Sequence, residues 1–254
     1  MENLIVIKIG GNSIETLTPS FFSQIRQWML VKKRILIIHG GGSKISELSD
    51  TLKIPVKKVD GMRVTDTATL ELTRMVLLGQ TQPQLLMKLT KAEIPAIGLN
   101  AADESILNGS FLNKKKYGLV GKIDRVDDTL LGEILDKHIA VLAPMVLTDE
   151  QQWLNVNADT AASKIAGLLK AEKLYLMTDV PGVLHEGEIV RSLSPSTAAK
   201  LQEQKIITMG MQPKIKAAFS ALSLGVPSVQ ITNQLTTLGT TIIQEGANEN
   251  AIYF

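Results

Sequence analysis

The sequence contains no cysteine among its 254 residues, and this absence excludes two kinds of site. A disulfide framework and a zinc site built on thiolates both require cysteine. The lack of cysteine also fits a reducing compartment such as the cytoplasm. The three histidines, His39, His138 and His185, lie too far apart in the chain to show the spacing of a metal-binding motif, so we expect no protein-held metal.

The sequence also has little net charge and no long apolar run. The 27 lysines and arginines are balanced by 25 aspartates and glutamates, which gives a net charge of only +2. Such a balance argues against nucleic acid as the main partner. No apolar stretch approaches the ~20 residues of a membrane span, and the first residues lack the pattern of a signal peptide. We therefore expect no membrane association and a cytoplasmic location.

Short apolar runs that alternate with helix-period segments are what the sequence does contain. The runs are apolar on both faces, which is typical of parallel strands covered by helices on each side. This alternation predicts an α/β sandwich around a mostly parallel sheet, with no linker that would divide residues 1–254 into separate domains. The predicted strands are Leu4–Ile9, Ile35–Ile38, Ala96–Leu99, Val141–Ala143, Leu174–Met177, Ser228–Ile231 and Thr240–Ile243.

Helix starts and hairpins can also be predicted locally. Thr65 is a candidate N-cap, and Ser194-Pro195 reads as an N-cap followed by the first helical position. Pro213 could open a further helix that Gly225 closes. Two stretches, 183–191 and 107–123, have the pattern of hairpins rather than of helices.

Two glycine-rich loops follow the first two predicted strands. Lys8 stands near the end of an otherwise apolar strand, ahead of Gly10 and Gly11, and the second strand runs into the triplet 40–42. In open α/β sheets, ligands bind beyond the carboxyl ends of the strands. Glycines let the backbone approach an anion, and the free N–H groups of a helix start attract it. Two such loops beside a lysine favour phosphate chemistry over simple tight turns.

The familiar phosphate motifs are nevertheless absent. A P-loop places its lysine after the glycines, whereas Lys8 precedes them, and the dinucleotide fingerprint G-x-G-x-x-G fails because Ile45 stands at its last position. This spacing weakens the interpretation as a nicotinamide-dependent dehydrogenase.

Three further charged residues are candidates for the same chemistry. Asn155, Asn157 and Asp159 alternate before a helix of small residues, so we expect them on one side of an extended segment, although Asp159 could also be a simple N-cap. Lys214 lies in the first turn of a predicted helix, where a cation opposes the helix dipole. A carboxylate between Lys8 and Lys214 would offset their repulsion, and Arg63 in a loop could hold a substrate carboxylate.

These pieces together resemble a known family. The segments "IKIGGNS", "IIHGGGSKI", "DGMRVTD", "LNVNADTAA", "MTDVPGVL" and "MGMQPKIKAA" are similar, in order and separation, to those of the amino-acid kinase superfamily, and within it to acetylglutamate kinases. The resemblance covers about Ile5 to Ile243, and "GMRVTD" does most to favour this branch over carbamate, aspartate or uridylate kinases.

The resemblance implies a fold, a reaction and a set of roles. The fold is a three-layer α/β/α sandwich with an acceptor lobe over about 1–170 and an ATP lobe over about 171–254. The reaction is phosphorylation of the side-chain carboxylate of N-acetyl-L-glutamate by ATP with Mg²⁺, a step of arginine biosynthesis. Lys8 and Lys214 would be the catalytic cations, with Asp159 ordering them. The other implied contacts are backbone N–H groups of Gly10, Gly11 and Gly41 for the phosphoryl group, Gly41, Gly42, Arg63 and Asn155 for the acceptor, Lys58 as an extra phosphate contact, and Asp179, Val180, Pro181, Gly182, Val183, Leu184, Ile206, Ile207 and Thr208 for the nucleotide.

The resemblance also bears on assembly and on the alternatives. The chain starts at its first strand, without the N-terminal helix of arginine-inhibited hexameric relatives, so we expect a homodimer insensitive to arginine. The alternatives are a sister kinase acting on another acidic acceptor, such as a carrier-linked aminoadipate, and a non-catalytic nucleotide-binding regulator of the same fold. Joint presence of Lys8, Asp159 and Lys214 argues against the regulator, because binding alone does not need all three.

Overall fold

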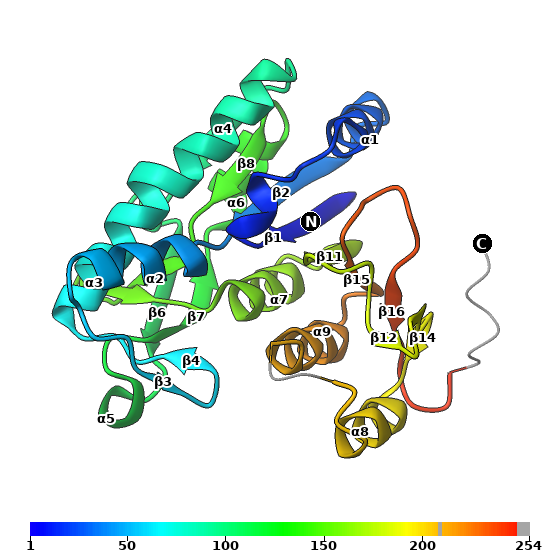
Figure 1. The fold of residues 1–254 in the computed structure, drawn as a ribbon. Coiled ribbons are helices and arrows are strands. Elements are labelled where there is room, and N and C mark those ends of the chain that lie inside the picture. The colour runs from blue at the N-terminus through cyan, green and yellow to red at the C-terminus, as the bar shows by residue number, and fades with distance from the viewer. Residues whose placement is uncertain (208–209, 248–254) are drawn as a thin grey trace.

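One large sheet forms the centre of the computed structural model, which describes residues 1–207 and 210–247 (Figure 1). Its strands lie in the order β14-β16-β15-β11-β1-β2-β8-β5, and every neighbouring pair is parallel except β15 and β16. All seven predicted strands are present in it. The bounds are β1 Leu4–Ile9, β2 Arg34–His39, β5 Ala96–Leu99, β8 Ile139–Leu142, β11 Lys173–Met177, β14 Ser192–Leu193, β15 Ser228–Thr232 and β16 Thr240–Ile242.

Helices cover both faces of this sheet, which confirms the predicted three layers. Because successive side chains of a strand point to opposite faces, β1 sends Leu4 and Val6 into one apolar cluster and Ile5 and Ile7 into another. The first cluster includes side chains of α6, α7, α8 and α9, and the second those of α1 and α4. The helix bounds are α1 Pro19–Leu30, α2 Gly42–Thr51, α3 Thr67–Arg74, α4 Gln82–Lys91, α5 Lys114–Tyr117, α6 Asp128–Leu135, α7 Ala158–Leu168, α8 Pro195–Glu203 and α9 Gln212–Ser223.

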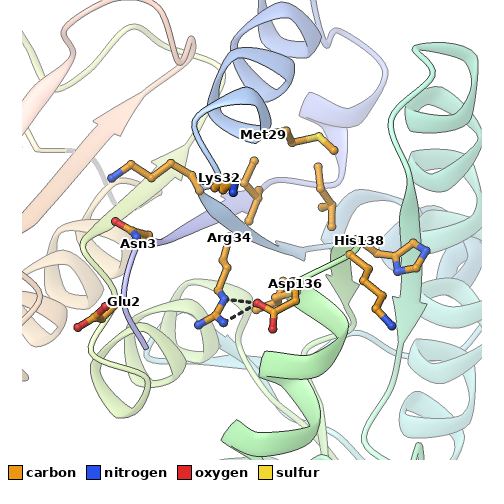
Figure 2. Close-up of a pocket in the computed structure, with 12 residues that line it drawn as sticks. Glu2, Asn3, Met29, Lys32, Arg34, Asp136 and His138 are labelled. Carbon is orange, nitrogen blue, oxygen red and sulfur yellow. Dashed lines mark hydrogen bonds and ion pairs between the residues drawn. The ribbon is translucent and has the colours of Figure 1, made fainter.

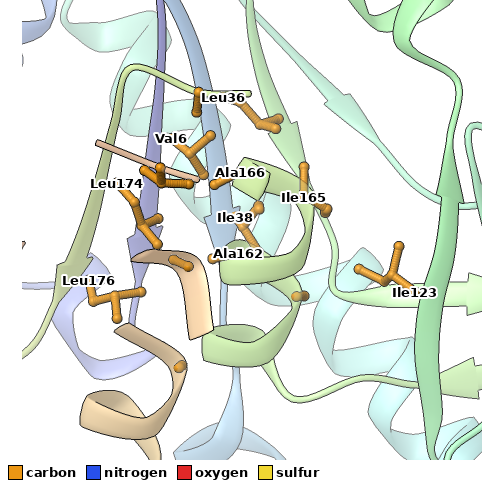
Figure 3. Close-up of a cluster of buried hydrophobic side chains, with 14 of the residues drawn as sticks. Val6, Leu36, Ile38, Ile123, Ala162, Ile165, Ala166, Leu174 and Leu176 are labelled. Atoms are coloured by element: carbon orange, nitrogen blue, oxygen red, sulfur yellow. The ribbon is translucent and has the colours of Figure 1, made fainter. Parts of the chain in front are cut away.

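Figure 3 shows α7 packed on the sheet, with Ala166 beside Val6 and Ala162 beside Ile38. Small side chains on α7 allow this close approach. Five of the six residues of β1 are aliphatic and at most 3% exposed. At about 2 kcal/mol for each buried aliphatic side chain, burial of this strand contributes on the order of 10 kcal/mol before entropy is counted. Lys8 is the exception, since it is 4% exposed and charged.

A smaller, four-stranded sheet stands beside the main one, in the order β10-β9-β6-β7. Strands β6 and β7 form the hairpin predicted over 107–123, and α5 lies in their connection. The hairpin of β9 and β10 was not predicted, because β9 follows β8 after only two residues and β10 is three residues long. The bounds are β6 Leu107–Phe111, β7 Gly121–Val126, β9 Met145–Leu147 and β10 Trp153–Asn155.

Two very short hairpins project from the body of the fold. β12 (Leu184–His185) pairs with β13 (Glu188–Ile189), as predicted for 183–191, and β3 (Lys58–Val59) pairs with β4 (Met62–Arg63). Two further helical segments are not α-helical. The tighter one is the 3₁₀ helix η1 (Asn12–Ile14), and the wider one is the π-helix η2 (Met75–Thr81), which joins α3 to α4.

Most of the predicted helix starts are confirmed, and one is wrong. Ser194 caps α8 by accepting a hydrogen bond from the Thr197 amide, and Pro213 stands in the first turn of α9. The cap of α3 is Asp66 rather than Thr65, because the Asp66 carboxylate accepts from the Thr69 amide at 2.8 Å. Thr65 is instead fully buried, and its hydroxyl donates to the Arg63 carbonyl. Within residues 1–207 and 210–247, no helix is long and apolar enough to cross a membrane.

Candidate active site

The two glycine loops meet at the carboxyl ends of β1 and β2. These strands are parallel neighbours, with Ile9 opposite His39, so the loops that follow them lie side by side. A Cβ atom on Gly11 would stand 2.9 Å from the Cα atom of Gly41. Backbone cannot yield as a flexible side chain can, so no other residue fits at Gly11 without displacing the second loop. The close contact brings both sets of backbone N–H groups to one place.

Lys8, Asp159 and Lys214 come together beside these loops. The Lys8 ammonium lies 2.9 Å from Oδ1 of Asp159, and the Lys214 ammonium donates a hydrogen bond to Oδ2 at 3.3 Å. The Lys8 and Asp159 side chains are 6% and 9% exposed, and that of Lys214 is 16% exposed. One carboxylate therefore holds two ammonium groups, as the sequence predicted.

Burial and mutual charge set the protonation of this cluster. Burial lowers the pKa of Lys8, Asp159 raises it and Lys214 lowers it, with a net result of about 8 instead of 10.5. For Asp159, burial raises the pKa, but the two neighbouring ammonium groups outweigh burial and the pKa is lowered. Asp159 is thus ionised at neutral pH, and Lys8 is a cation close to the point of losing its proton.

Local helix geometry explains how Asp159 reaches the lysines. The cap of α7 is Asn157, whose side chain accepts from the Thr160 amide at 3.0 Å. Asp159 is the second residue of the helix, so both the predicted alternation through Asp159 and the alternative that it is the N-cap are wrong. The extended backbone ends at Asn157, whose side chain satisfies the Thr160 amide, and α7 begins with the next residue. Lys214 is the third residue of α9, in its first turn as expected.

A cavity of about 270 Å³ opens onto these groups. Gly10, Gly11, Gly41, Gly42, Arg63 and Asn155 all line it, together with Lys8, Asp159 and Lys58. These residues come from four separate stretches of the chain, and their convergence is the main result of the structure for function. Lys214 reaches the same site through its bond to Asp159.

Arg63 enters the cavity from β4 and is only partly satisfied. Its Nη2 atom donates to the Gly42 carbonyl at 3.2 Å and to the Ser46 hydroxyl at 2.8 Å, whereas Nη1 has no hydrogen-bond partner among the described residues. Burial lowers the pKa of Arg63, and Asp50 raises it. Asn155 is linked to the segment that follows β4, since its amide donates to the Thr65 hydroxyl at 3.4 Å. A guanidinium donor without a hydrogen-bond partner suits an anionic group of a ligand.

Apolar residues of the cavity were missed by the sequence analysis. They include Ile45 of α2, Leu77 of η2 and Val120 before β7. The π-helix brings Leu77 so close to the second glycine loop that a Cβ on Gly41 would lie 2.9 Å from its Cδ2 atom. Apolar residues inside a helix carry no local signal that separates a cavity wall from a core, so only the tertiary structure could identify them.

The residues expected at the nucleotide lie apart from this cavity. The segment 179–184 follows β11 at the carboxyl edge of the sheet, and none of its residues lines the cavity. Val183 and Ile207 are both buried in the apolar cluster on the face of the sheet that α6, α7, α8 and α9 cover. Asp179 accepts a hydrogen bond from Thr178, and Thr208 lies outside the described residues.

A second cavity, of about 480 Å³, lies at the opposite, amino ends of β1, β2 and β8. Two of its charged side chains, Arg34 and Asp136, are paired with each other, as Figure 2 shows, and Arg34 Nε donates to Asp136 at 2.8 Å. Lys33 is paired in the same way with Glu172. This cavity shares no residue with the glycine loops, so we assign the chemistry to the smaller one.

The residues present do not form a protein-held metal site. Over the ranges 1–207 and 210–247, no group of three histidine or acidic side chains is close enough together to bind a metal ion. The one carboxylate in the cavity, Asp159, is already bound by two ammonium groups. A divalent cation at this site would have to be held by a ligand's own oxygen atoms.

Comparisons with known proteins agree on the family. The model of the amino acid kinase family matches residues 3–233. The acetylglutamate kinase of Lactiplantibacillus plantarum is 51% identical over 247 residues, which is 97% of this chain and 100% of that protein. The acetylglutamate kinase of Listeria monocytogenes serotype 4b is 46% identical over 95% of this chain and 97% of its own length.

A solved structure has the same architecture. The crystal structure of smu.665 from Streptococcus mutans UA159 superposes with a TM-score of 0.90 at 35% sequence identity, and the match covers 95% of this chain and 99% of the other. The large parallel sheet and its covering helices are therefore shared along nearly the whole length of both chains.

Proposed function

Because the chain belongs to the amino acid kinase family, we propose that it transfers the γ-phosphoryl group of ATP to the side-chain carboxylate of N-acetyl-L-glutamate. The products are N-acetyl-L-glutamyl 5-phosphate and ADP, and the reaction is a step of arginine biosynthesis. The observation that carries the proposal is the buried cluster in which Asp159 binds both Lys8 and Lys214 beside two glycine loops. Two full-length relatives named acetylglutamate kinase support the choice of acceptor.

Phosphoryl transfer of this kind requires little proton chemistry. A carboxylate oxygen of the acceptor attacks the γ-phosphorus while the bond from that phosphorus to the bridging oxygen of ADP breaks, and no proton has to move. Charge on the transferring group is then the main obstacle, and preorganised cations and N–H groups reduce it. We propose that Lys8 and Lys214 stabilise the negative charge of the transferring phosphoryl group. The amides of Gly10, Gly11 and Gly41 would donate hydrogen bonds to its equatorial oxygens.

The acceptor would lie in the cavity that the glycine loops and the β3–β4 hairpin enclose. Arg63 and Asn155 would bind its α-carboxylate, since both line the cavity and Nη1 of Arg63 has no hydrogen-bond partner among the described residues. Backbone groups of Gly41 and Gly42 would complete the contacts, and Lys58 would add an extra contact to the phosphate. Asp159 acts through the lysines, as the group that holds both in place.

ATP would bind along the loops 179–184 and 206–208, so that the acceptor lobe covers about residues 1–170 and the ATP lobe about 171–254. Magnesium would arrive bound to the phosphates of ATP, because Asp159 already neutralises two lysines. With ATP as donor, we place the reaction in the cytoplasm.

We further propose a homodimer that uses the β5 edge of the main sheet. This edge carries apolar side chains that the single chain leaves exposed: Ile97 of β5 is 36% exposed and Met87 of the adjacent α4 is 54% exposed. A strand edge and a partly apolar helix are typical of a surface that a second copy covers. Sedimentation velocity of the protein and of a Met87→Glu variant tests this assembly.

The function is tested by the release of ADP from Mg-ATP with purified protein. N-acetyl-L-glutamate, L-glutamate, L-aspartate, carbamate and UMP are offered as acceptors, and hydroxylamine traps any acyl phosphate. Turnover with N-acetyl-L-glutamate alone, together with a hydroxamate product, is the expected result. Turnover with a different acceptor would overturn the assignment of Arg63 and Asn155, and ATP binding without turnover would favour a carrier-linked substrate or a regulator.

A further inference from the structure

The β3–β4 hairpin places two cationic side chains at the acceptor cavity, although its strands are very short. Lys58 and Arg63 are paired across it, and both line the cavity. Each strand has only two residues, and the turn consists of Asp60 at φ 51° and Gly61 at φ 77°, as in a type I′ turn. An isolated two-stranded hairpin is at best marginally stable in water. Its position must therefore come from contacts outside the hairpin.

We propose that Asp60 is a positioning residue for acceptor binding, which fastens the tip of the hairpin to α5 so that Lys58 and Arg63 face the cavity. Oδ2 of Asp60 accepts two bonds, from the Lys116 ammonium at 2.6 Å and from the Tyr117 hydroxyl at 2.8 Å. The inference rests on the proposed function, because it concerns the acceptor of that reaction.

The base of the hairpin is attached to the same segment as its tip. The Thr65 amide donates to the Tyr117 carbonyl at 3.0 Å, and the Leu119 amide donates to the Thr65 carbonyl at 2.6 Å. Tyr117 is 8% exposed, so its ring is fixed by the surrounding protein and its hydroxyl is held at one place. The tip and the base of the hairpin are therefore both attached to residues 117–119, and Arg63 lies between these two attachments.

The tip of the hairpin also faces the helix that carries Lys214. A Cβ on Gly61 would lie 3.7 Å from Pro213 of α9, which is ordinary van der Waals contact. The hydrogen bonds from Lys116 and Tyr117 lower the pKa of Asp60, and the charge of Lys216 on α9 lowers it further. Asp60 thus lies between α5 and α9, the helix that carries Lys214.

The contact predicts a specific kinetic effect. Loss of the Asp60 contacts loosens the tip of the hairpin but removes no contact of Lys8, Asp159 or Lys214. The acceptor then meets a less ordered Arg63, while the transferring phosphoryl group keeps its main contacts with Lys8, Lys214 and the glycine amides. Acceptor KM should therefore rise with little change in kcat or in the KM for ATP.

The experiment compares Asp60→Asn, Tyr117→Phe and the double variant with the unaltered protein. Asparagine keeps the size of the side chain and tolerates positive φ, and phenylalanine keeps the buried ring. Asp124→Asn is the matched control, since it breaks an exposed pair with Lys122 at 3.7 Å on β7, away from the hairpin. Steady-state kinetics with N-acetyl-L-glutamate and ATP are measured for each, along with the thermal unfolding midpoint.

Each single variant should raise the KM for N-acetyl-L-glutamate by about three- to tenfold, with kcat and the KM for ATP within about twofold of the unaltered protein. The double variant should be no worse than the worse single one, because both changes remove the same contact. Asp124→Asn should change none of these values. Unchanged acceptor KM, additive effects, or a loss confined to kcat would overturn the inference. Absence of turnover by the unaltered protein would instead overturn the proposed function, and this inference with it.

Discussion

Replacement of Asp159 by asparagine is the most direct test of the charge cluster. The change removes one negative charge and almost no volume. At 2.9 Å and an effective dielectric of ~20, the attraction between Lys8 and Asp159 is worth about 6 kcal/mol. Two ammonium groups left facing each other at ~6 Å would repel by about 3 kcal/mol. Lys8 already has its pKa lowered to about 8, so in the variant it should lose its proton at neutral pH.

The expected result is a fall in kcat of about 10²- to 10³-fold at pH 7.5, the size seen when one preorganised charge-stabilising donor is lost. The alkaline limb of the kcat/KM profile should also move to lower pH. Both are measured by ADP release over pH 6–10. Asp136→Asn, which breaks the exposed pair with Arg34, is the control and should have no effect on kcat.

Loss of folding must be separated from loss of charge in this test. Removal of one partner of a buried ion pair destabilises a protein by about 3–5 kcal/mol. The double variant Lys8→Met with Asp159→Asn removes the two most buried charges of the cluster, so it should recover much of the stability but none of the activity. If Asp159→Asn keeps kcat within tenfold of the unaltered protein and leaves the alkaline limb near pH 8, the reasoning about this cluster is refuted.

Other predictions address single residues of the same site. Lys8→Ala should lower kcat by about 10²- to 10³-fold, and near-normal kcat would remove Lys8 from the chemistry. Arg63→Ala should raise the KM for the acceptor far more than the KM for ATP, whereas equal rises would place Arg63 on the wrong substrate. Since Lys8 is protonated below its pKa of about 8 and loses its proton above it, kcat/KM for ATP should fall above pH 8; a flat profile to pH 10, or the same limb in Lys8→Arg, would contradict this. Gly11→Ala should cost about 1–3 kcal/mol of stability in chemical denaturation, because its Cβ meets the Gly41 backbone at 2.9 Å; an unchanged midpoint would show that the loops yield.

Much of the fold could be predicted because its strands are buried on both faces. Such strands appear in the sequence as continuous apolar runs, and β1 and β5 were predicted to the residue. Strand β14 has two residues and β10 has three, so neither offers enough sequence to show a pattern. The antiparallel pairing of β15 and β16 is a long-range choice that the local sequence does not encode.

The candidate site was predictable where chemistry makes a residue unusual in its setting. A lysine inside an aliphatic strand and a lysine at a helix start both oppose local preferences, and both lie on Asp159. The identity of a helix cap depends on one hydrogen bond, so Thr65 was wrongly predicted as the cap that Asp66 provides, and the alternative that Asp159 caps α7 was also wrong. Asp60 and Tyr117 gave no signal, because their meeting joins residues 57 positions apart.

The place of β1 in the sheet has a consequence for the growing chain on the ribosome. β1 is made first, yet it is a central strand whose second neighbour, β11, begins only at Lys173. At ~5–20 residues per second, β1 and β2 wait roughly 7–27 s between the end of β2 and the start of β11. During that interval an aliphatic strand has one open edge, where it could pair with another nascent chain. Lys8 places a charge on that strand, so a residue assigned to catalysis also makes the unfinished strand a poorer template for aggregation.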